Sequence, residues 1–147
     1  LALVEMLSDL PPQGQEAAQL RAMLQTAARG VAAAQDPHTG LWRQILDEPT
    51  LADNWFETSA SAMFVYALQV GAERGWLEAR YSRVAARGWR GLQAKLSLGP
   101  DGAPQVADAV EGMGVQPSAA DYLAKQRLTN STHGLAAVLL AASVMEW

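Results

Sequence analysis

The sequence predicts an all-α protein built from helical hairpins. Apolar residues recur with helical spacing along almost the whole chain, and no run of alternating apolar and polar residues bounded by turn formers indicates a strand. The order of long helix, short turn, long helix and long loop then repeats, which is typical of αα-hairpins packed side by side. We therefore predict the all-α class.

A proline pair separates the first two predicted helices. The first carries an apolar stripe formed by Leu1, Leu3, Val4, Leu7 and Leu10. Pro11 and Pro12 end it, because proline cannot continue a helix. The second spans residues 14–34, with an apolar face made of Ala17, Leu20, Met23, Leu24, Ala27, Ala28 and Val31. A loop rich in turn formers follows in residues 35–54.

The third and fourth predicted helices contain informative glycines. The third lies within DNWFETSASAMFVYALQVG, residues 53–71, and Gly71 suits a left-handed cap at its end. The fourth spans residues 77–98, with Tyr81, Val84, Ala85, Leu92 and Leu96 aligned. Inside it, Gly88 and Gly91 each cost about 1 kcal/mol relative to alanine, so we expect them to let a neighbouring backbone approach closely.

The last part of the chain is predicted to hold a long connection and two helices. Residues 97–118 are rich in glycine and proline, and connections longer than about 15 residues are usually functional or disordered. A short helix is predicted near residues 119–126 and a final helix over residues 131–146. Three hairpins of this size cannot close a ring of six, but they could form half of one. The domain prediction is a single all-α unit over residues 1–147.

The composition narrows the possible partners. Half of the 147 residues are apolar, 18% are charged and the net charge is −4 with both signs scattered, so we expect neither nucleic acid nor a membrane as partner. The chain has no cysteine and two histidines, and we therefore expect no metal and no cofactor. Its apolar runs are shorter than the roughly 20 residues of a membrane span. These observations favour a cytoplasmic protein.

The start of the chain predicts that part of the protein is missing. LALVEMLSDLPP lacks an initiator methionine and has the pattern of the last turns of an amphipathic helix. We therefore expect the chain to be a piece of a longer protein. Part of a barrel leaves apolar edges unburied, so self-association or pairing with the missing N-terminal part is expected.

Four strings together resemble a known enzyme family. They are DPHTGLWRQILD, NWFETSASAMFVYALQVGAERGWL, YSRVAARGWRGL and TNSTHGLAAVLLA. In order and spacing they resemble the C-terminal half of the unsaturated rhamnogalacturonyl hydrolases, glycoside hydrolase family 105. The resemblance covers essentially the whole chain and implies about half of an (α/α)6 barrel.

The resemblance also implies a reaction. In that family, water is added across the C4=C5 double bond of an unsaturated galacturonyl residue on pectin-derived rhamnogalacturonan oligosaccharides. An aspartic acid donates a proton to C4, water adds at C5, and the resulting hemiketal opens and releases the sugar. Most glycosidases instead displace a group at the anomeric carbon with two carboxylates.

The chain departs from the family in its catalytic residues. The family's catalytic aspartate and its GNGW element lie in the N-terminal half, and this sequence contains neither. The carboxylates Asp36, Asp47, Asp53 and Asp121 match no catalytic position. We therefore predict no catalytic residue in this chain, and no turnover by the chain alone.

Five residues are predicted to bind substrate. Trp42 and Gln44 lie in a loop and could stack on a sugar and bond its hydroxyls, although Trp42 could equally close the end of the barrel. Tyr122, Arg127 and His133 follow the long connection and correspond to a family segment near the pocket entrance. Arg127 could pair there with a substrate carboxylate.

Two further polar residues are assigned a structural role. Asn54 is a good N-cap, and Glu57 stands three residues later, the spacing of a capping box. We therefore predict that Glu57 caps the third helix rather than serving in a binding site. Asn130 is placed to cap the helix that contains His133.

Two alternative functions remain. One is an unsaturated glucuronyl hydrolase acting on another polyuronide. The other is a helical-hairpin scaffold, without enzymatic activity, that binds a protein partner. A hydrolase predicts tryptophan and polar groups converging at one end of the hairpins, whereas a scaffold predicts an exposed apolar stripe along them.

Overall fold

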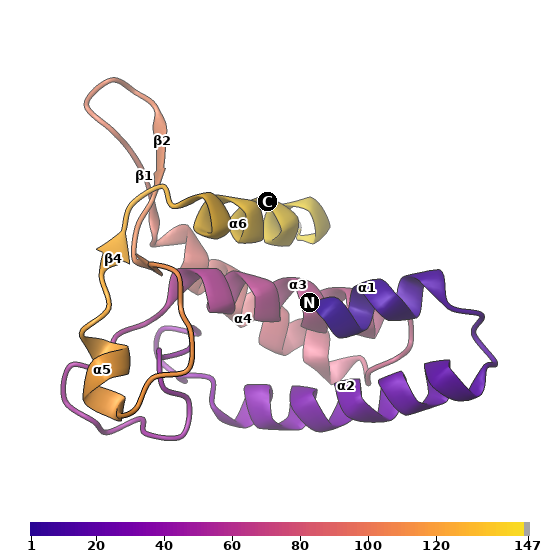
Figure 1. Cartoon of the computed structure of the whole chain (residues 1–147). Helices are drawn as coiled ribbons and strands as arrows, with labels where there is room; N and C mark the ends of the chain where they lie inside the picture. Colours follow the sequence, from indigo (N-terminus) through magenta and orange to yellow (C-terminus); the bar gives the residue numbers. More distant parts are fainter. Residues whose placement is uncertain (146–147) are drawn as a thin grey trace.

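The computed structural model describes residues 1–145 and is mostly helical (Figure 1). Its helices are α1 (Ala2–Asp9), α2 (Gln15–Ala33), α3 (Thr58–Glu73), α4 (Arg80–Gln93), α5 (Ala119–Leu123) and α6 (Thr132–Val144). Its strands are β1 (Leu96–Leu98), β2 (Pro104–Val106), β3 (Ala109–Val110) and β4 (Arg127–Leu128). The predicted all-α class is confirmed.

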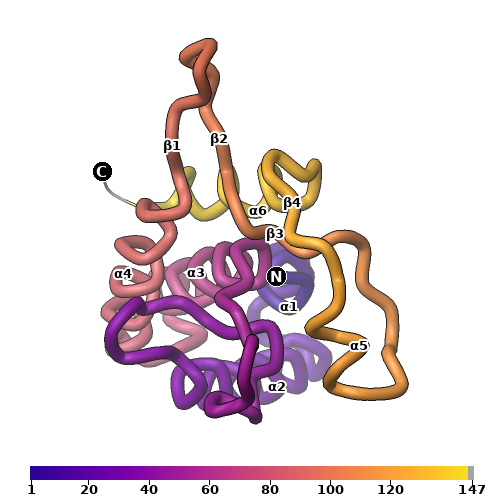
Figure 2. The backbone as a smooth tube through the Cα atoms, turned by 90° about the vertical axis from the view of Figure 1, so that its left-hand side faces the viewer, coloured from indigo at the N-terminus to yellow at the C-terminus, as the bar shows by residue number. Residues whose placement is uncertain are grey.

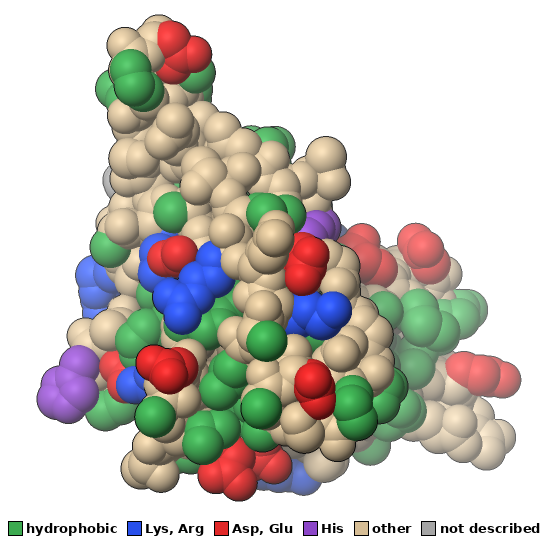
Figure 3. All heavy atoms as spheres, turned by 60° about the vertical axis from the view of Figure 1, so that its left-hand side comes forward, with side chains coloured by type: hydrophobic (Ala, Val, Ile, Leu, Met, Phe, Trp, Pro, Cys, Tyr) green, Lys and Arg blue, Asp and Glu red, His purple; other side chains and the backbone are tan. Residues whose placement is uncertain are grey.

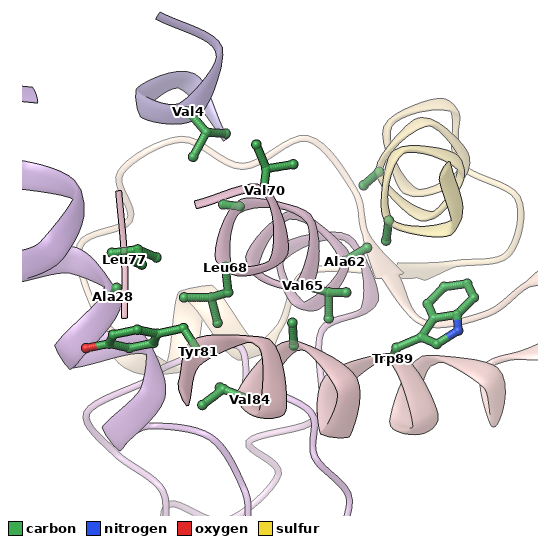
Figure 4. Packing of buried hydrophobic residues seen from close by; sticks show 14 of the residues in the cluster. Val4, Ala28, Ala62, Val65, Leu68, Val70, Leu77, Tyr81, Val84 and Trp89 are labelled. Atoms are coloured by element: carbon green, nitrogen blue, oxygen red, sulfur yellow. The ribbon is translucent and has the colours of Figure 1, made fainter. Parts of the chain in front are cut away.

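Helix α3 forms the centre of the packing. It lies against α4 and α6 along its length and also contacts α1, which in turn packs on α2 (Figures 1 and 2). Val65 and Leu68 point from α3 toward α4, whereas Val70 points toward Val4 of α1 (Figure 4). Burial on several sides suits this sequence, because α3 has no charged residue before its last position, Glu73.

Small residues make this close packing possible. A Cβ on Gly88 would lie 2.6 Å from Cγ2 of Val65, and a Cβ on Gly91 would lie 2.3 Å from the carbonyl oxygen of Thr39. Real Cβ atoms do not approach other atoms this closely, so both positions require glycine. The predicted close approach of a neighbouring backbone is therefore confirmed at Gly91, where the loop before α3 packs directly on α4. At Gly88 the close neighbours are instead the side chains of Val65 and Trp42.

Several predicted boundaries are wrong. Helix α3 begins at Thr58, and it continues past Gly71 to Glu73, with the left-handed conformation at Gly75 instead (φ +70°). Helix α4 ends at Gln93, not near residue 98. Beyond it, β1 pairs with β2 in an antiparallel hairpin, and β3 pairs with β4. Strands of two or three residues are too short for alternation to reveal them.

The third predicted hairpin is also corrected. Helix α5 is only five residues long and lies at the loop end of the molecule, whereas α6 runs along α3 (Figure 1). The structure thus holds two long hairpins, α1–α2 and α3–α4, and a further helix, α6. The predicted end of α6 at residue 146 lies outside the described residues. None of the helices within residues 1–145 combines the length and apolar character needed to cross a membrane.

Candidate functional site

The candidate site lies where α3 and α6 begin. The strand pair β3–β4 and the loop that contains α5 are gathered at this end of the helices (Figure 2). The backbone N–H of Thr58, the first residue of α3, donates to the carbonyl oxygen of Asp108 at 3.0 Å. In the strand pair, Val110 faces Arg127. Segments far apart in the sequence therefore meet here.

Glu57 joins these segments through its carboxylate, which is 2% exposed. It is the N-cap of α3, and its oxygens accept from the backbone N–H of Ser59 at 3.1 Å and of Ala60 at 2.5 Å. The Ser59 hydroxyl donates to both oxygens, at 2.8 and 3.0 Å. Oε1 also accepts from the backbone N–H of Val110 at 2.9 Å, so Glu57 fastens β3 to the start of α3.

The cap therefore differs in detail from the predicted capping box. Asn54 is not the N-cap: its buried amide donates to the carbonyl oxygens of Ile45 and Glu48, and it accepts from the Ile45 N–H. It closes the loop before α3 instead. The capping role of Glu57 is confirmed, but the carboxylate bonds forward into its own helix and across to Val110 rather than back to Asn54.

The predicted cap of α6 is corrected in the same way. Ser131 is the N-cap, and its hydroxyl accepts from the Gly134 N–H at 3.2 Å. Asn130 has a left-handed backbone, with φ of 56°. Its side-chain oxygen accepts from the Val106 N–H at 2.8 Å, so it ties the start of α6 to β2.

Arg127 is an exposed cation held in a defined position. Its guanidinium lies over the ring of Trp55, with Cζ 4.8 Å from the ring centroid, an arrangement that cation–π attraction favours. Trp55 is itself buried, and its indole nitrogen has no hydrogen-bond partner within the described residues. Next to it, Arg43 lies over Phe56 at 4.4 Å. This end of the fold thus presents two arginines stacked on adjacent aromatic rings.

Of the other predicted site residues, His133 and Gln44 contact segments of this cluster, and Tyr122 lies in the neighbouring α5 loop. Nε2 of the half-buried His133 is 2.5 Å from the carbonyl oxygen of Val110, the residue that faces Arg127 across the strand pair. The backbone N–H of Gln44 donates to the Trp55 carbonyl at 2.8 Å, which joins the main chains of these two residues. Tyr122 lies on α5, where its hydroxyl accepts from the Gln116 N–H at 3.2 Å.

Trp42 lies in the core. It is fully buried, its indole N–H donates to the carbonyl oxygen of Val31 at 2.6 Å, and its ring meets Phe64 edge to face at 5.4 Å. No face of the ring is open to a sugar. Its geometry matches the packing alternative, in which the tryptophan closes the end of the helices.

Trp55 and Arg43 were not among the predicted site residues. Both belong to segments that were predicted as a helix cap and a loop, NWFE and LWRQ. An available signal was the adjacency of two aromatic residues to the predicted cap. The pairing of each ring with an arginine could not be inferred, because Arg127 is distant in the sequence.

The turn DPHTG is closed by hydrogen bonds to its first residue, Asp36. The Asp36 carboxylate accepts from the backbone N–H groups of His38 and Thr39 and from the Thr39 hydroxyl, and Arg43 lies 4.0 Å away. Burial by itself raises the pKa of Asp36, but the Thr39 and His38 hydrogen bonds and the Arg43 charge outweigh it, so the pKa lies below the ordinary 3.8. His38 is exposed at the tip of this turn.

A cleft of about 600 Å³ lies between this turn and α4. Its polar lining includes Thr39, Arg87, Arg90, Lys95 and Asp108, and Phe56 forms part of the wall. The Lys95 ammonium is paired with the Asp108 carboxylate at 2.7 Å. Lysine and arginine side chains gather on the face below the projecting β1–β2 hairpin (Figure 3). Within residues 1–145, no group of three or more His, Asp or Glu side chains is placed to hold a metal ion.

A cleft between helices that is lined by aromatic side chains and a few charged groups is a typical small-molecule site. The sequence profile of Glycosyl Hydrolase Family 88 matches residues 1–146, and the chain belongs to this family. It is 36% identical over 120 residues to Protein Atu3128 of Agrobacterium fabrum, with 78% of this chain aligned. The 24.9 kDa protein in the picA locus of Rhizobium radiobacter matches equally well, and the chain spans 51% of each relative.

Solved structures agree with this assignment. A family 105 glycoside hydrolase of C. acetobutylicum superposes with a TM-score of 0.90 at 27% identity, over 96% of this chain and 41% of that one. A possible family 105 member from Salmonella enterica gives 0.82 at 27% identity, over 95% and 35%. A family 88 hydrolase of Bacteroides vulgatus gives 0.72 at 27% identity, over 96% and 38%. The resemblance to family 105 is confirmed, and the chain spans less than half of each of these structures.

Proposed function

We propose that this chain is the C-terminal part of an (α/α)6-barrel hydrolase that hydrates the C4=C5 double bond of an unsaturated galacturonyl residue on rhamnogalacturonan-derived oligosaccharides. Membership of family 88 and the superposition on family 105 structures support a glycoside hydrolase. The finer assignment of substrate and reaction rests on the arrangement at the start of α3 and α6.

The observation that carries the proposal is the position of Arg127. Its guanidinium is exposed and stacked on Trp55, so its N–H groups remain available at the edge of the plane. A planar guanidinium held in this way matches a carboxylate through two parallel hydrogen bonds. An unsaturated uronic acid carries such a carboxylate, next to its double bond. In this proposal Arg127 holds the carboxylate, and His133, Gln44 and Tyr122 contact the sugar hydroxyls.

The chain does not supply the proton donor in this proposal. Glu57 is the buried acid at this end, and Ser59, Ala60 and Val110 already donate to its oxygens. A carboxylate held as an acceptor by three backbone N–H groups is a structural cap, not a free acid. The catalytic aspartate belongs to the N-terminal part of the barrel, as the resemblance implies. An unsaturated glucuronyl residue, the alternative substrate, would use the same carboxylate contact.

The exposed part of α6 fits a hydrolase as well as a scaffold. Leu139 is 69% exposed on a helix that is apolar on most of its faces, which is the composition of a buried helix. In the proposal, the remaining helices of the barrel or a second copy cover this surface. The convergence of Trp55, Arg127 and His133 at one end favours the hydrolase over the scaffold.

Calorimetric titration with unsaturated galacturonyl-rhamnose tests the binding assignment. The chain is expected to bind this disaccharide, and Arg127→Gln is expected to weaken binding by roughly tenfold or more, since a charge-assisted hydrogen bond is lost. Arg74→Gln removes the same charge at an exposed position outside the cluster and should leave affinity unchanged. Equal affinities for the two variants would refute the role of Arg127.

The predicted cytoplasmic location remains a prediction.

A further inference from the structure

A row of arginines follows the outer face of α4. Arg80, Arg83, Arg87 and Arg90 are spaced by three or four residues, so they lie on one side of the helix. Arg29 of α2 joins them in a second cleft, of about 480 Å³, between α2 and α4. We call these five residues the arginine stripe.

No acidic residue of α4 balances this charge. The helix RYSRVAARGWRGLQ contains neither Asp nor Glu, and the second cleft has no acidic lining. Glu78 pairs with Arg80 at 2.9 Å, but the side chains of Arg83 and Arg90 form no ion pair or hydrogen bond with any residue from 1 to 145. Like charges at this spacing destabilise a helix. The dipole of α4 also disfavours cations in its first turn, where Arg80 and Arg83 stand.

The stripe continues into the cleft described above. Arg87 lines both clefts, and its guanidinium is fixed by two hydrogen bonds to the side-chain oxygen of Gln35, at 3.1 and 2.6 Å. Arg90 and Phe56 line the larger cleft, and Phe56 is next in sequence to Trp55. A cationic path therefore leads along α4 toward the end of the fold where Arg127 lies.

We propose that the arginine stripe binds the acidic backbone of a polyuronate chain. A polyuronate carries one carboxylate per sugar, which suits a row of guanidinium groups along one face. The choice of a polyuronate rather than another polyanion as the ligand rests on the proposed function, in which the enzyme acts on fragments of an acidic polysaccharide. A net charge of −4 makes the chain as a whole repel polyanions, so binding depends on this local surface.

The test compares polymers and matched variants. Affinity electrophoresis is run in gels that contain polygalacturonate, fully methyl-esterified polygalacturonate or dextran, at low and high salt. We expect retardation by the free acid only, and less of it at high salt, because salt screens exposed charges. One double variant, Arg83→Gln with Arg90→Gln, removes two charges of the arginine stripe. The control double variant, Arg74→Gln with Lys125→Gln, removes two positive charges elsewhere. None of these four residues is among those proposed to bind the substrate carboxylate or its hydroxyls.

The stripe variant should bind polygalacturonate about two- to thirtyfold more weakly, as expected for the loss of two exposed ion pairs. The control should bind as the unchanged chain does, and circular dichroism should show both variants folded. Equal weakening in the control, equal retardation by the methyl ester, or stronger binding of duplex DNA than of polygalacturonate would overturn the proposal. These polymers lack the C4=C5 bond, so the outcome is separate from any test of hydration.

Discussion

The contacts of Glu57 predict how strongly its replacement destabilises the fold. Replacing it by alanine removes the acceptor for the backbone N–H groups of Ser59, Ala60 and Val110. Loss of an N-cap costs about 1 kcal/mol, and leaving the buried Val110 amide unpaired costs about 1–3 kcal/mol. We therefore expect Glu57→Ala to lower the free energy of unfolding by about 2–4 kcal/mol, a large part of the roughly 5–15 kcal/mol of a typical domain.

Urea denaturation followed by far-ultraviolet circular dichroism measures this change. Glu57→Gln keeps the shape and one acceptor oxygen, so its loss should be smaller, about 1–2 kcal/mol. Glu73→Ala, an exposed acid at the other end of α3, serves as the control and should change stability by less than about 0.5 kcal/mol. If Glu57→Ala costs no more than Glu73→Ala, the carboxylate does not fasten β3 to α3, and the reasoning is refuted.

Three further predictions concern packing, pH and association. Gly91→Ala should destabilise the fold by about 1–3 kcal/mol, because the added Cβ meets the Thr39 carbonyl. Gly30→Ala has open space around it and should stabilise the fold by about 0.5–1 kcal/mol. Thermal melts in which both variants raise the melting temperature, or both lower it, would contradict the packing. Asp36 has a lowered pKa, so it contributes stability at neutral pH that is lost as the pH falls through that pKa, below 3.8. Asp36→Asn should therefore be less stable than the unchanged chain at pH 7 and equally stable in acid. A difference in stability that does not change with pH would argue against this. Leu139→Lys places a charge on the exposed apolar part of α6 and should reduce self-association in sedimentation; an unchanged, monomeric profile for both proteins would disprove the expected association.

Local rules predicted much of the fold. The spacing of apolar residues located α2 within one residue of its observed ends, and the cost of Gly88 and Gly91 correctly indicated close contact. The start of α3 was missed because Glu57 is itself the N-cap, bonded to the Ser59 and Ala60 N–H groups, and its carboxylate also accepts from Val110, a residue 53 positions away. A capping box is a pattern of neighbouring residues, so it cannot predict that a distant strand also donates a hydrogen bond to the same carboxylate.

The candidate site was less predictable than the fold. Arg127 and His133 were predicted from the family resemblance, and their binding role stays a prediction; both lie next to β3. Trp55 was missed, since only the folded chain brings Arg127 over its ring. Trp42 satisfied the chemistry of sugar stacking, but its N–H bond to Val31 and its full burial place it in the core. Residue type suggests what a side chain can do, whereas burial decides whether a ligand can reach it.

The ultraviolet absorbance of unsaturated galacturonyl-rhamnose tests the central claim most directly. Hydration removes the C4=C5 bond and with it the absorbance. With residues 1–147 alone, we predict that the disaccharide binds but its absorbance stays constant, whereas the complete gene product that contains this chain consumes it. Turnover by residues 1–147 alone would show that the chain holds its own proton donor. A complete product that leaves the absorbance unchanged would contradict the proposed reaction.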